Sequence, residues 1–276
     1  PWAGDYRFAG TVHPNTQGPA LATLCLAALG LARENGRTRV WLWVVFAIAF
    51  GLLLLTKSRT TTAAIVLAIA AVQVVKTPLA AKCAGVLSLG WLAAAALLAI
   101  WLCGFDPLSD FRDALLLGRA EESDTLSGRA FIWPEVMSFA SERFWLGYGY
   151  ESFWTAARIE TISTNLGWGL REAHNAYLEA MLSLGAVGVV LFLLVAGAGL
   201  AASIRSWRAT NQAVHTLPIG LIVFGLLNAG LESGMVAVSE LVPFLLGCCL
   251  LRLGLFRDVG WAKQAERAPA HHPLVT

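Results

Sequence analysis

The fold is decided at residues 171–188, which read REAHNAYLEAMLSLGAVG. Residues 105–173 are polar or mixed, whereas a long apolar run follows His174. We therefore expect His174 where a water-exposed loop enters a membrane helix. An unperturbed histidine titrates near neutral pH, which suits a general base. The alternative is a histidine that only caps a transmembrane helix at the interface.

The composition indicates a membrane protein. Of the 276 residues, 57% are hydrophobic and 14% are charged, and the mean hydropathy is +0.64. A soluble domain usually has about 25% charged residues. The chain begins at Pro1 without a signal-peptide pattern, and we expect a fragment preceded by further membrane helices. The cysteines lie in or beside apolar runs without metal-ligand spacing, so we interpret them as small core residues: Cys25, Cys83, Cys103, Cys248 and Cys249.

The apolar runs predict an all-α polytopic transmembrane bundle. Each run approaches the ~20 residues that a helix needs to cross the hydrocarbon. The expected divisions are four spans within residues 1–104, a loop at 105–173, three spans within 174–253 and a tail at 254–276. The loop is expected to contain short interfacial helices, at 108–117 and from Ser127 onward, the latter with Ser127 as cap. The seven spans are 16–32, 40–55, 60–75, 84–103, 176–202, 214–231 and 235–251.

The distribution of Lys and Arg predicts the orientation. One set of connections is basic and has few acids, Glu34, Asp258 and Glu266. The positive-inside rule makes this side cytoplasmic, so the start of the chain and the 105–173 loop face outward and the tail faces inward. The basic residues of the inner side are Arg33, Arg37, Arg39, Lys76, Lys82, Arg205, Arg208, Arg252, Arg257, Lys263 and Arg267.

Two outward-facing arginines are candidates for binding phosphate. Arg59 lies in a very short connection between two spans, and Arg129 opens a predicted helix whose N-terminus could face the same anion. The planar fork of arginine binds phosphate oxygens in bidentate fashion. The alternatives are a snorkelling interfacial Arg59 and a solvated Arg129.

The outer acids are interpreted mainly as solvated groups. Glu122-Ser123-Asp124 could be a metal-binding motif, but a solvated acidic turn is the simpler interpretation, and no metal is expected. Glu179, Glu232 and Glu240 lie just inside spans near the outer face. Ionisable groups in membrane helices are functional candidates, although all three are shallow enough to reach water.

Several motifs occur in order and with spacing that fits this topology. They are His174-Asn175 followed by Gly185-Ala186-Val187-Gly188, Gly128-Arg129 with Trp133, Leu146-Gly147-Tyr148-Gly149, Ser58-Arg59, and Arg7 with Gly10 and His13-Pro14-Asn15. Together they resemble the O-antigen ligase superfamily, which includes O-antigen polymerases. Val189 stands where the ligase pattern often has Gly, Thr or Tyr, which leaves ligase and polymerase both open.

The resemblance implies an enzyme of the bacterial inner membrane with its active site on the periplasmic side. Such an enzyme moves a glycan from undecaprenyl diphosphate to a sugar of the lipid A core, or to another lipid-linked repeat in lipopolysaccharide or exopolysaccharide synthesis. His174 would be the catalytic base and would invert the anomeric carbon, and Arg59 and Arg129 would bind the diphosphate. Arg7, Asn175, Glu179 and Trp133 would support them, without cofactor or nucleic acid.

Two hypotheses of other classes stay open. A transporter or flippase for a lipid-linked sugar would also need outer arginines, but paired broken helices or midplane ions are its usual signs and none is evident in the sequence. A structural membrane subunit would explain the spans but not the ordered loop motifs.

Overall fold

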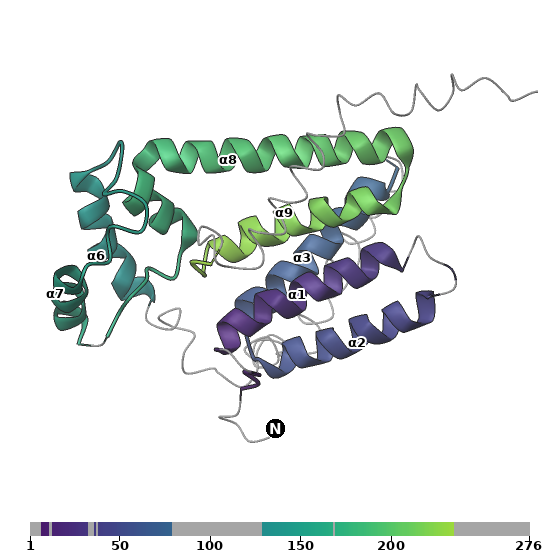
Figure 1. Cartoon of the computed structure of the whole chain (residues 1–276), viewed down its shortest axis with the longest axis horizontal. Helices are drawn as coiled ribbons and strands as arrows, with labels where there is room; N and C mark the ends of the chain where they lie inside the picture. The colour runs from purple at the N-terminus through teal and green to yellow at the C-terminus, as the bar shows by residue number, and fades with distance from the viewer. Residues whose placement is uncertain are drawn as a thin grey trace, which may run out of the picture.

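The computed structural model describes residues 7–10, 13–32, 36, 38–78, 129–167 and 169–234, and in these ranges all regular structure is helical (Figure 1). This confirms the all-α prediction for the part described. The predictions for 84–103, 108–117, 235–251 and the tail lie outside these residues. The helices are α1 (Pro14–Leu31), α2 (Arg39–Leu55), α3 (Arg59–Lys76), α6 (Arg129–Glu142), α7 (Ala156–Leu166), α8 (Ala176–Thr210), the 3-10 turn η2 (Ala213–His215) and α9 (Thr216–Ala229).

The long helices form a bundle, and α6 and α7 lie beyond one of its ends (Figure 1). The bundle core is built mainly from small and branched residues, including Ala22, Cys25, Ile65, Ala68 and Phe224. Small residues let helix backbones approach closely, which is the usual basis of helix packing in membranes. This packing brings the N-termini of α1 and α3 and the C-terminus of α9 to the same end of the bundle.

The outward faces of the bundle are apolar. Two helices, α3 and α8, are long and apolar enough to cross a membrane, and α2 and the η2–α9 segment are shorter apolar helices. Large hydrophobic side chains are exposed along α2 and α8, among them Trp41, Ile48, Val190, Leu191 and Leu194. A soluble monomer rarely exposes so continuous an apolar surface, so these faces are suited to hydrocarbon.

A second core packs α6 and α7 against the start of α8. Ile132 and Val136 of α6, Ile162 of α7 and Leu182 of α8 are buried together around Phe153. The sequence predicted a helix beginning after Ser127, and α6 begins at Arg129. Because this core includes α8, the α6–α7 layer is attached to the same helix that follows His174.

The predicted fifth span, 176–202, is longer in the structure and is broken. Helix α8 extends to Thr210, and Gly185 has φ 65° and ψ −164°, so the first turns bend away from the rest (Figure 1). The loop 144–149 fills the break: Tyr148 N and Gly149 N donate to the carbonyls of Leu182 and Ser183 at 2.7 and 2.9 Å. In return Ala186 N donates to the Phe144 carbonyl at 2.7 Å.

Glycines are required where this loop meets the helix. A Cβ on Gly185 would lie 2.3 Å from the backbone of Trp145, and one on Gly147 would lie 2.6 Å from the Leu182 carbonyl oxygen. Both glycines also have φ of +65°. Two glycines that the sequence analysis took only as family motifs therefore allow two backbones to touch.

Candidate functional site

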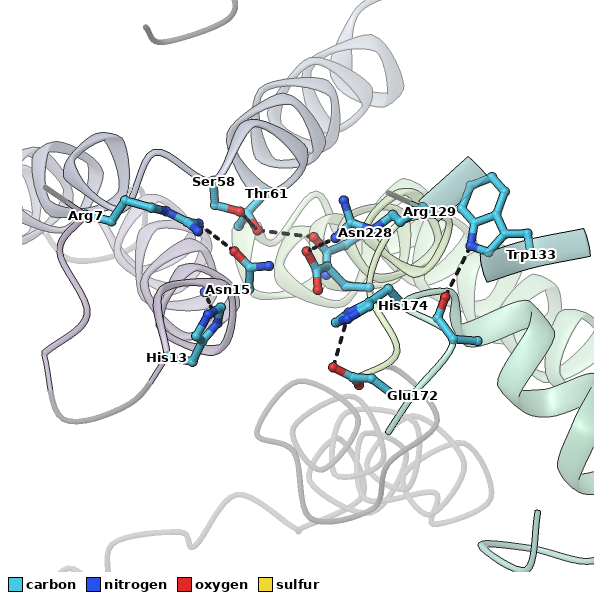
Figure 2. Close-up of polar contacts among 12 residues, drawn as sticks. Arg7, His13, Asn15, Ser58, Thr61, Arg129, Trp133, Glu172, His174 and Asn228 are labelled. Carbon is cyan, nitrogen blue, oxygen red and sulfur yellow. Dashed lines mark hydrogen bonds and ion pairs between the residues drawn. The ribbon is translucent and has the colours of Figure 1, made fainter. Parts of the chain in front are cut away.

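Polar side chains gather at the end of the bundle where α1 and α3 begin and α9 ends. In Figure 2 these side chains come from segments far apart in the sequence, and those of Arg7, Arg129 and His174 point toward a common region. Sequence separation is large, so this site exists only in the folded chain. Its labelled members are Arg7, His13 and Asn15 at the start of the described chain, Ser58 and Thr61 at α3, Arg129 and Trp133 of α6, Glu172 and His174 before α8, and Asn228 of α9.

His174 occupies a left-handed backbone conformation, with φ 50°. Its side chain is 32% exposed, enough to meet a substrate, and Nδ1 lies 3.2 Å from Oε1 of Glu172. Burial lowers the pKa of His174 below its usual value, and Glu172 opposes that shift, while Arg129 and His13 add to it. A lowered pKa favours the neutral imidazole, which is the form that can accept a proton.

Both backbone polar groups of Ala173, the residue just before His174, are hydrogen-bonded to side chains. Ala173 N donates to Oε1 of Glu179 at 2.6 Å, and Trp133 Nε1 donates to the Ala173 carbonyl at 3.2 Å. The other carboxylate oxygen of Glu179 accepts from Trp154 Nε1 at 2.9 Å. Glu179 is buried rather than shallow and water-exposed as the sequence interpretation had it. Trp133 and Glu179 thus act on His174 through Ala173.

The backbone just after His174 is held by a helix cap. Oδ1 of Asn175 accepts from the backbone N–H groups of Tyr177 and Leu178 at 2.9 and 3.1 Å, which makes Asn175 the N-cap of α8. The next N–H, of Ala176, donates to the Glu232 carbonyl at 3.2 Å. Asn175, rather than His174, therefore caps the helix, which removes the simplest structural reason for a histidine at position 174.

Arg129 forms an ion pair that the sequence analysis did not foresee. Its Nη2 lies 2.9 Å from Oε1 of Glu232, and each side chain is 11% exposed. Burial raises the pKa of Glu232 to about 7, against the lowering effect of Arg129. Glu232 is thus corrected from a shallow acid inside a span to a buried partner in the turn after α9. The Nε of Arg129 is buried and has no hydrogen-bond partner among the described residues.

Arg7 and Arg59 belong to the same electrostatic environment. Arg7 donates from Nη2 to Oδ1 of Asn15 at 2.6 Å and from Nε to the Thr56 carbonyl at 3.0 Å. Burial lowers the pKa of Arg7, Glu232 raises it, and Arg59 and Arg129 lower it further. Arg59 is the half-buried first residue of α3. Arg7 is thus repelled by two other guanidinium groups and attracted by the carboxylate of Glu232.

A hydrogen-bonded chain connects α3 to α9 beneath these charges. Ser58 Oγ donates to Thr61 Oγ1 at 3.0 Å, and Thr61 Oγ1 donates to Oδ1 of Asn228 at 3.3 Å. Sequence reasoning missed Thr61, Asn228 and the role of Glu232. The available signal was an amide inside an apolar helix, since polar groups in membrane helices mark functional or packing sites.

The described part of the chain contains no group of three or more His, Cys, Asp or Glu residues that could hold a metal ion. The acidic turn at 121–124 lies outside that part. Among the described residues, the charged groups that act on His174 are the carboxylate of Glu172 and the guanidinium of Arg129. An arginine is suited to binding oxygen anions.

An apolar helical bundle with a cationic, partly buried site at one end is characteristic of a membrane protein. Residues 44–193 match the family described as O-antigen ligase, and the chain belongs to that family. It is 25% identical over 271 residues to the exopolysaccharide production protein ExoQ of Rhizobium meliloti (strain 1021), a match that covers 91% of this chain. The chain spans 58% of the length of that relative.

Proposed function

We propose that the protein is an inner-membrane glycosyltransferase that moves a glycan from undecaprenyl diphosphate to a sugar hydroxyl, with its site on the periplasmic side. One observation carries the proposal: Arg7, Arg129 and His174, from segments far apart in sequence, point toward a common region at one end of the bundle (Figure 2). Arg59, the first residue of α3, acts electrostatically on Arg7. A lipid diphosphate supplies the anion, and a sugar hydroxyl supplies the proton.

In the proposed reaction the bond between the anomeric carbon and the diphosphate oxygen breaks, and the diphosphate leaves with the electron pair. The acceptor hydroxyl attacks the same carbon from the opposite face, which inverts it, and His174 takes the hydroxyl proton. Arg59 and Arg129 stabilise the negative charge that develops on the leaving group. The diphosphate carries away the electron pair and His174 carries away the proton, so the proposed step requires no metal.

The contacts of His174 support its role as base. Its lowered pKa keeps the imidazole neutral before the reaction, and the carboxylate of Glu172 at 3.2 Å stabilises the imidazolium that forms. The bonds to Ala173 and the Asn175 cap fix the position of the ring relative to Arg129. A positioned base of this kind contributes typically 10²–10⁴-fold to the rate.

Two acceptors fit this chemistry. The family match favours ligation to a sugar of the lipid A core. The relative is named for exopolysaccharide production, which favours a second candidate, a polymerase that joins lipid-linked repeats. The break in α8 is a feature that transporters also use, but here backbone groups of the 144–149 loop fill it, so transport of a lipid-linked sugar has less support.

The test is transfer by the protein reconstituted in vesicles with a lipid-linked oligosaccharide donor. Glycan appearing on lipid A-core supports the ligase, and longer lipid-linked chains support the polymerase. Movement of the donor across the bilayer without a new glycosidic bond would overturn the proposal. Full activity in the presence of a chelator is expected, and loss that a divalent metal restores would contradict the metal-independent step.

A further inference from the structure

The loop that fills the break in α8 carries an exposed apolar tip, Phe144-Trp145-Leu146. Their side chains are 48%, 69% and 73% exposed. The backbone beneath them is rigid, because Ala186 N and Val187 N donate to the carbonyls of Phe144 and Trp145 at 2.7 and 3.3 Å. An apolar tip on a fixed backbone cannot withdraw from water by folding inward, so another medium must cover it.

The tip is continuous with the apolar surface of α8. Leu184 and Val187, on either side of the break, are exposed, and the exposed row continues along α8 through Val190, Leu191 and Leu194. Because α8 is long and apolar enough to cross a membrane, this row faces hydrocarbon. The tip therefore stands at the outer end of a lipid-facing surface.

The other side of the tip is cationic and aromatic. The exposed Arg143 precedes it, with its guanidinium carbon 5.1 Å from the centroid of the Tyr148 ring, and that of Arg158 lies 4.5 Å from the same ring. Tyr and Trp gather at the depth of the lipid head groups, where arginine can reach the phosphates. The change from apolar to cationic across a few residues matches the change from acyl chain to head group.

We propose that the Phe144-Trp145-Leu146 tip is a membrane anchor that lies in the outer interface of the lipid bilayer, and that Gly185 marks the depth at which α8 enters the hydrocarbon. Residues 186–210 still make about 37 Å of helix at 1.5 Å per residue, more than the ~30 Å hydrocarbon core. The segment Ala176–Leu184 then lies on the head-group side, together with the loop that carries His174. This assignment is independent of the proposed reaction.

The consequence is that one loop sets the height of the α6–α7 layer above the membrane. The tip is joined to α6 through Arg143, whose carbonyl accepts from Gly147 N at 2.9 Å. Arg129 lies at the other end of α6. Lipid contact at the tip therefore fixes the height of the helix that delivers Arg129.

Spin labels at single cysteines test the depth of the tip. Leu146→Cys, in a background with the five native cysteines replaced, is compared in phosphatidylethanolamine–phosphatidylglycerol vesicles with Leu191→Cys on α8 and Glu160→Cys on α7. The spin label at 146 should collide more often with oxygen than with a water-soluble nickel chelate, and the label at 191 should show a larger difference in the same direction. The label at 160 should collide more often with the nickel chelate. A label at 146 that behaves like the one at 160, or that is shielded from both reagents by a protein partner, overturns the proposal.

A second measurement leaves the native cysteines in place. Brominated lipids quench tryptophans that they contact, and the chain has 11 tryptophans, so the contribution of Trp145 is read as the difference between the wild type and Trp145→Phe. The quenched emission should fall in the variant when shallow brominated lipids are used. An unchanged quenched fraction would show that Trp145 does not contact lipid.

Discussion

At the scale of single residues, His174 is a non-glycine residue kept at positive φ by its neighbours. Such a conformation costs on the order of 1–3 kcal/mol and persists only where the surroundings over-determine it. Here the surroundings are the two bonds to Ala173 and the cap made by Asn175. The hydrogen bonds made by the residues on both sides of His174 fit a residue whose ring position matters.

We predict that His174→Ala and His174→Gln both reduce transfer by roughly 10²–10⁴-fold, the usual contribution of a positioned base. Glutamine keeps a hydrogen-bonding side chain but cannot take the proton. Turnover and melting temperature are measured on the same purified variants. Near-normal turnover in His174→Gln would mean that the histidine has only a structural role. Asn175→Ala, which removes the helix cap, is the control variant in which the melting temperature should fall.

The pH dependence of transfer should follow the pKa of His174. The base acts when neutral, so the rate should rise with pH and level off, with a midpoint below the ordinary histidine value because burial lowers this pKa. Glu172 raises the pKa of His174, so Glu172→Gln should move the midpoint to still lower pH. The measurement is the pH profile of kcat/KM in the wild type and in Glu172→Gln. A midpoint that is higher in the variant would exclude Glu172 as the partner of His174.

Arg129 should resist conservative replacement. Nη2 is engaged by Glu232 while Nε is unpartnered among the residues described, so one guanidinium can serve the protein and the donor at once. Lysine lacks the fork, and one hydrogen bond to a charged group contributes about 1.5–3 kcal/mol. Arg129→Lys should therefore lose roughly tenfold or more in kcat/KM. Arg143→Lys, an exposed change outside the site, is the matched control and should retain activity.

At the scale of elements, the sequence predicted the first residues of two helices better than the course of a helix after its start. Asn175 before an apolar run and Arg129 after Ser127-Gly128 are local signals, and α8 and α6 begin where they indicate. The break at Gly185 has no such signal, because a glycine inside an apolar run is also compatible with an unbroken span. Only the backbone of Trp145, 40 residues earlier in the chain, makes that glycine necessary.

Two glycines of α8 test the break directly. Gly185→Ala places a Cβ 2.3 Å from the Trp145 backbone at a φ and ψ open essentially to glycine alone, whereas a Cβ on Gly197 meets nothing within 4 Å. Gly185→Ala should cost at least about 1–3 kcal/mol from backbone strain, and Gly197→Ala should be neutral or stabilising by up to about 1 kcal/mol. Thermal unfolding of both variants compares them, and equal melting temperatures would mean that the break tolerates a side chain.

At the scale of the whole molecule, long-range pairing is what the sequence could not supply. Arg129 and Glu232 are 103 residues apart, and Thr61 and Asn228 are 167 apart. Each of these residues has an ordinary local interpretation as a loop or helix residue. The arginines and His174 could be predicted as site residues from the sequence, because the chemistry and position of each can be judged separately. Their partners could not, because the packing of α3, α6 and α9 determines which residues meet.

The charge distribution of the folded chain gives the last prediction. At the end of the bundle opposite His174, the described residues include Arg39, Lys76, Arg205 and Arg208 and no Asp or Glu (Figure 1). The positive-inside rule assigns that end to the cytoplasm, which would put His174, Arg129 and α7 outside, where a lipid-linked glycan that has crossed the membrane would meet them.

Membrane-impermeant maleimide distinguishes the two ends in intact spheroplasts, in a background without native cysteines. Glu160→Cys on α7 should be labelled at once, and Gln212→Cys, exposed in the turn after α8, should be labelled only after lysis. Both positions are exposed, so a difference between them reports the side of the membrane rather than burial. Labelling of Gln212→Cys alone in intact spheroplasts would place the site in the cytoplasm and would contradict a periplasmic transfer reaction.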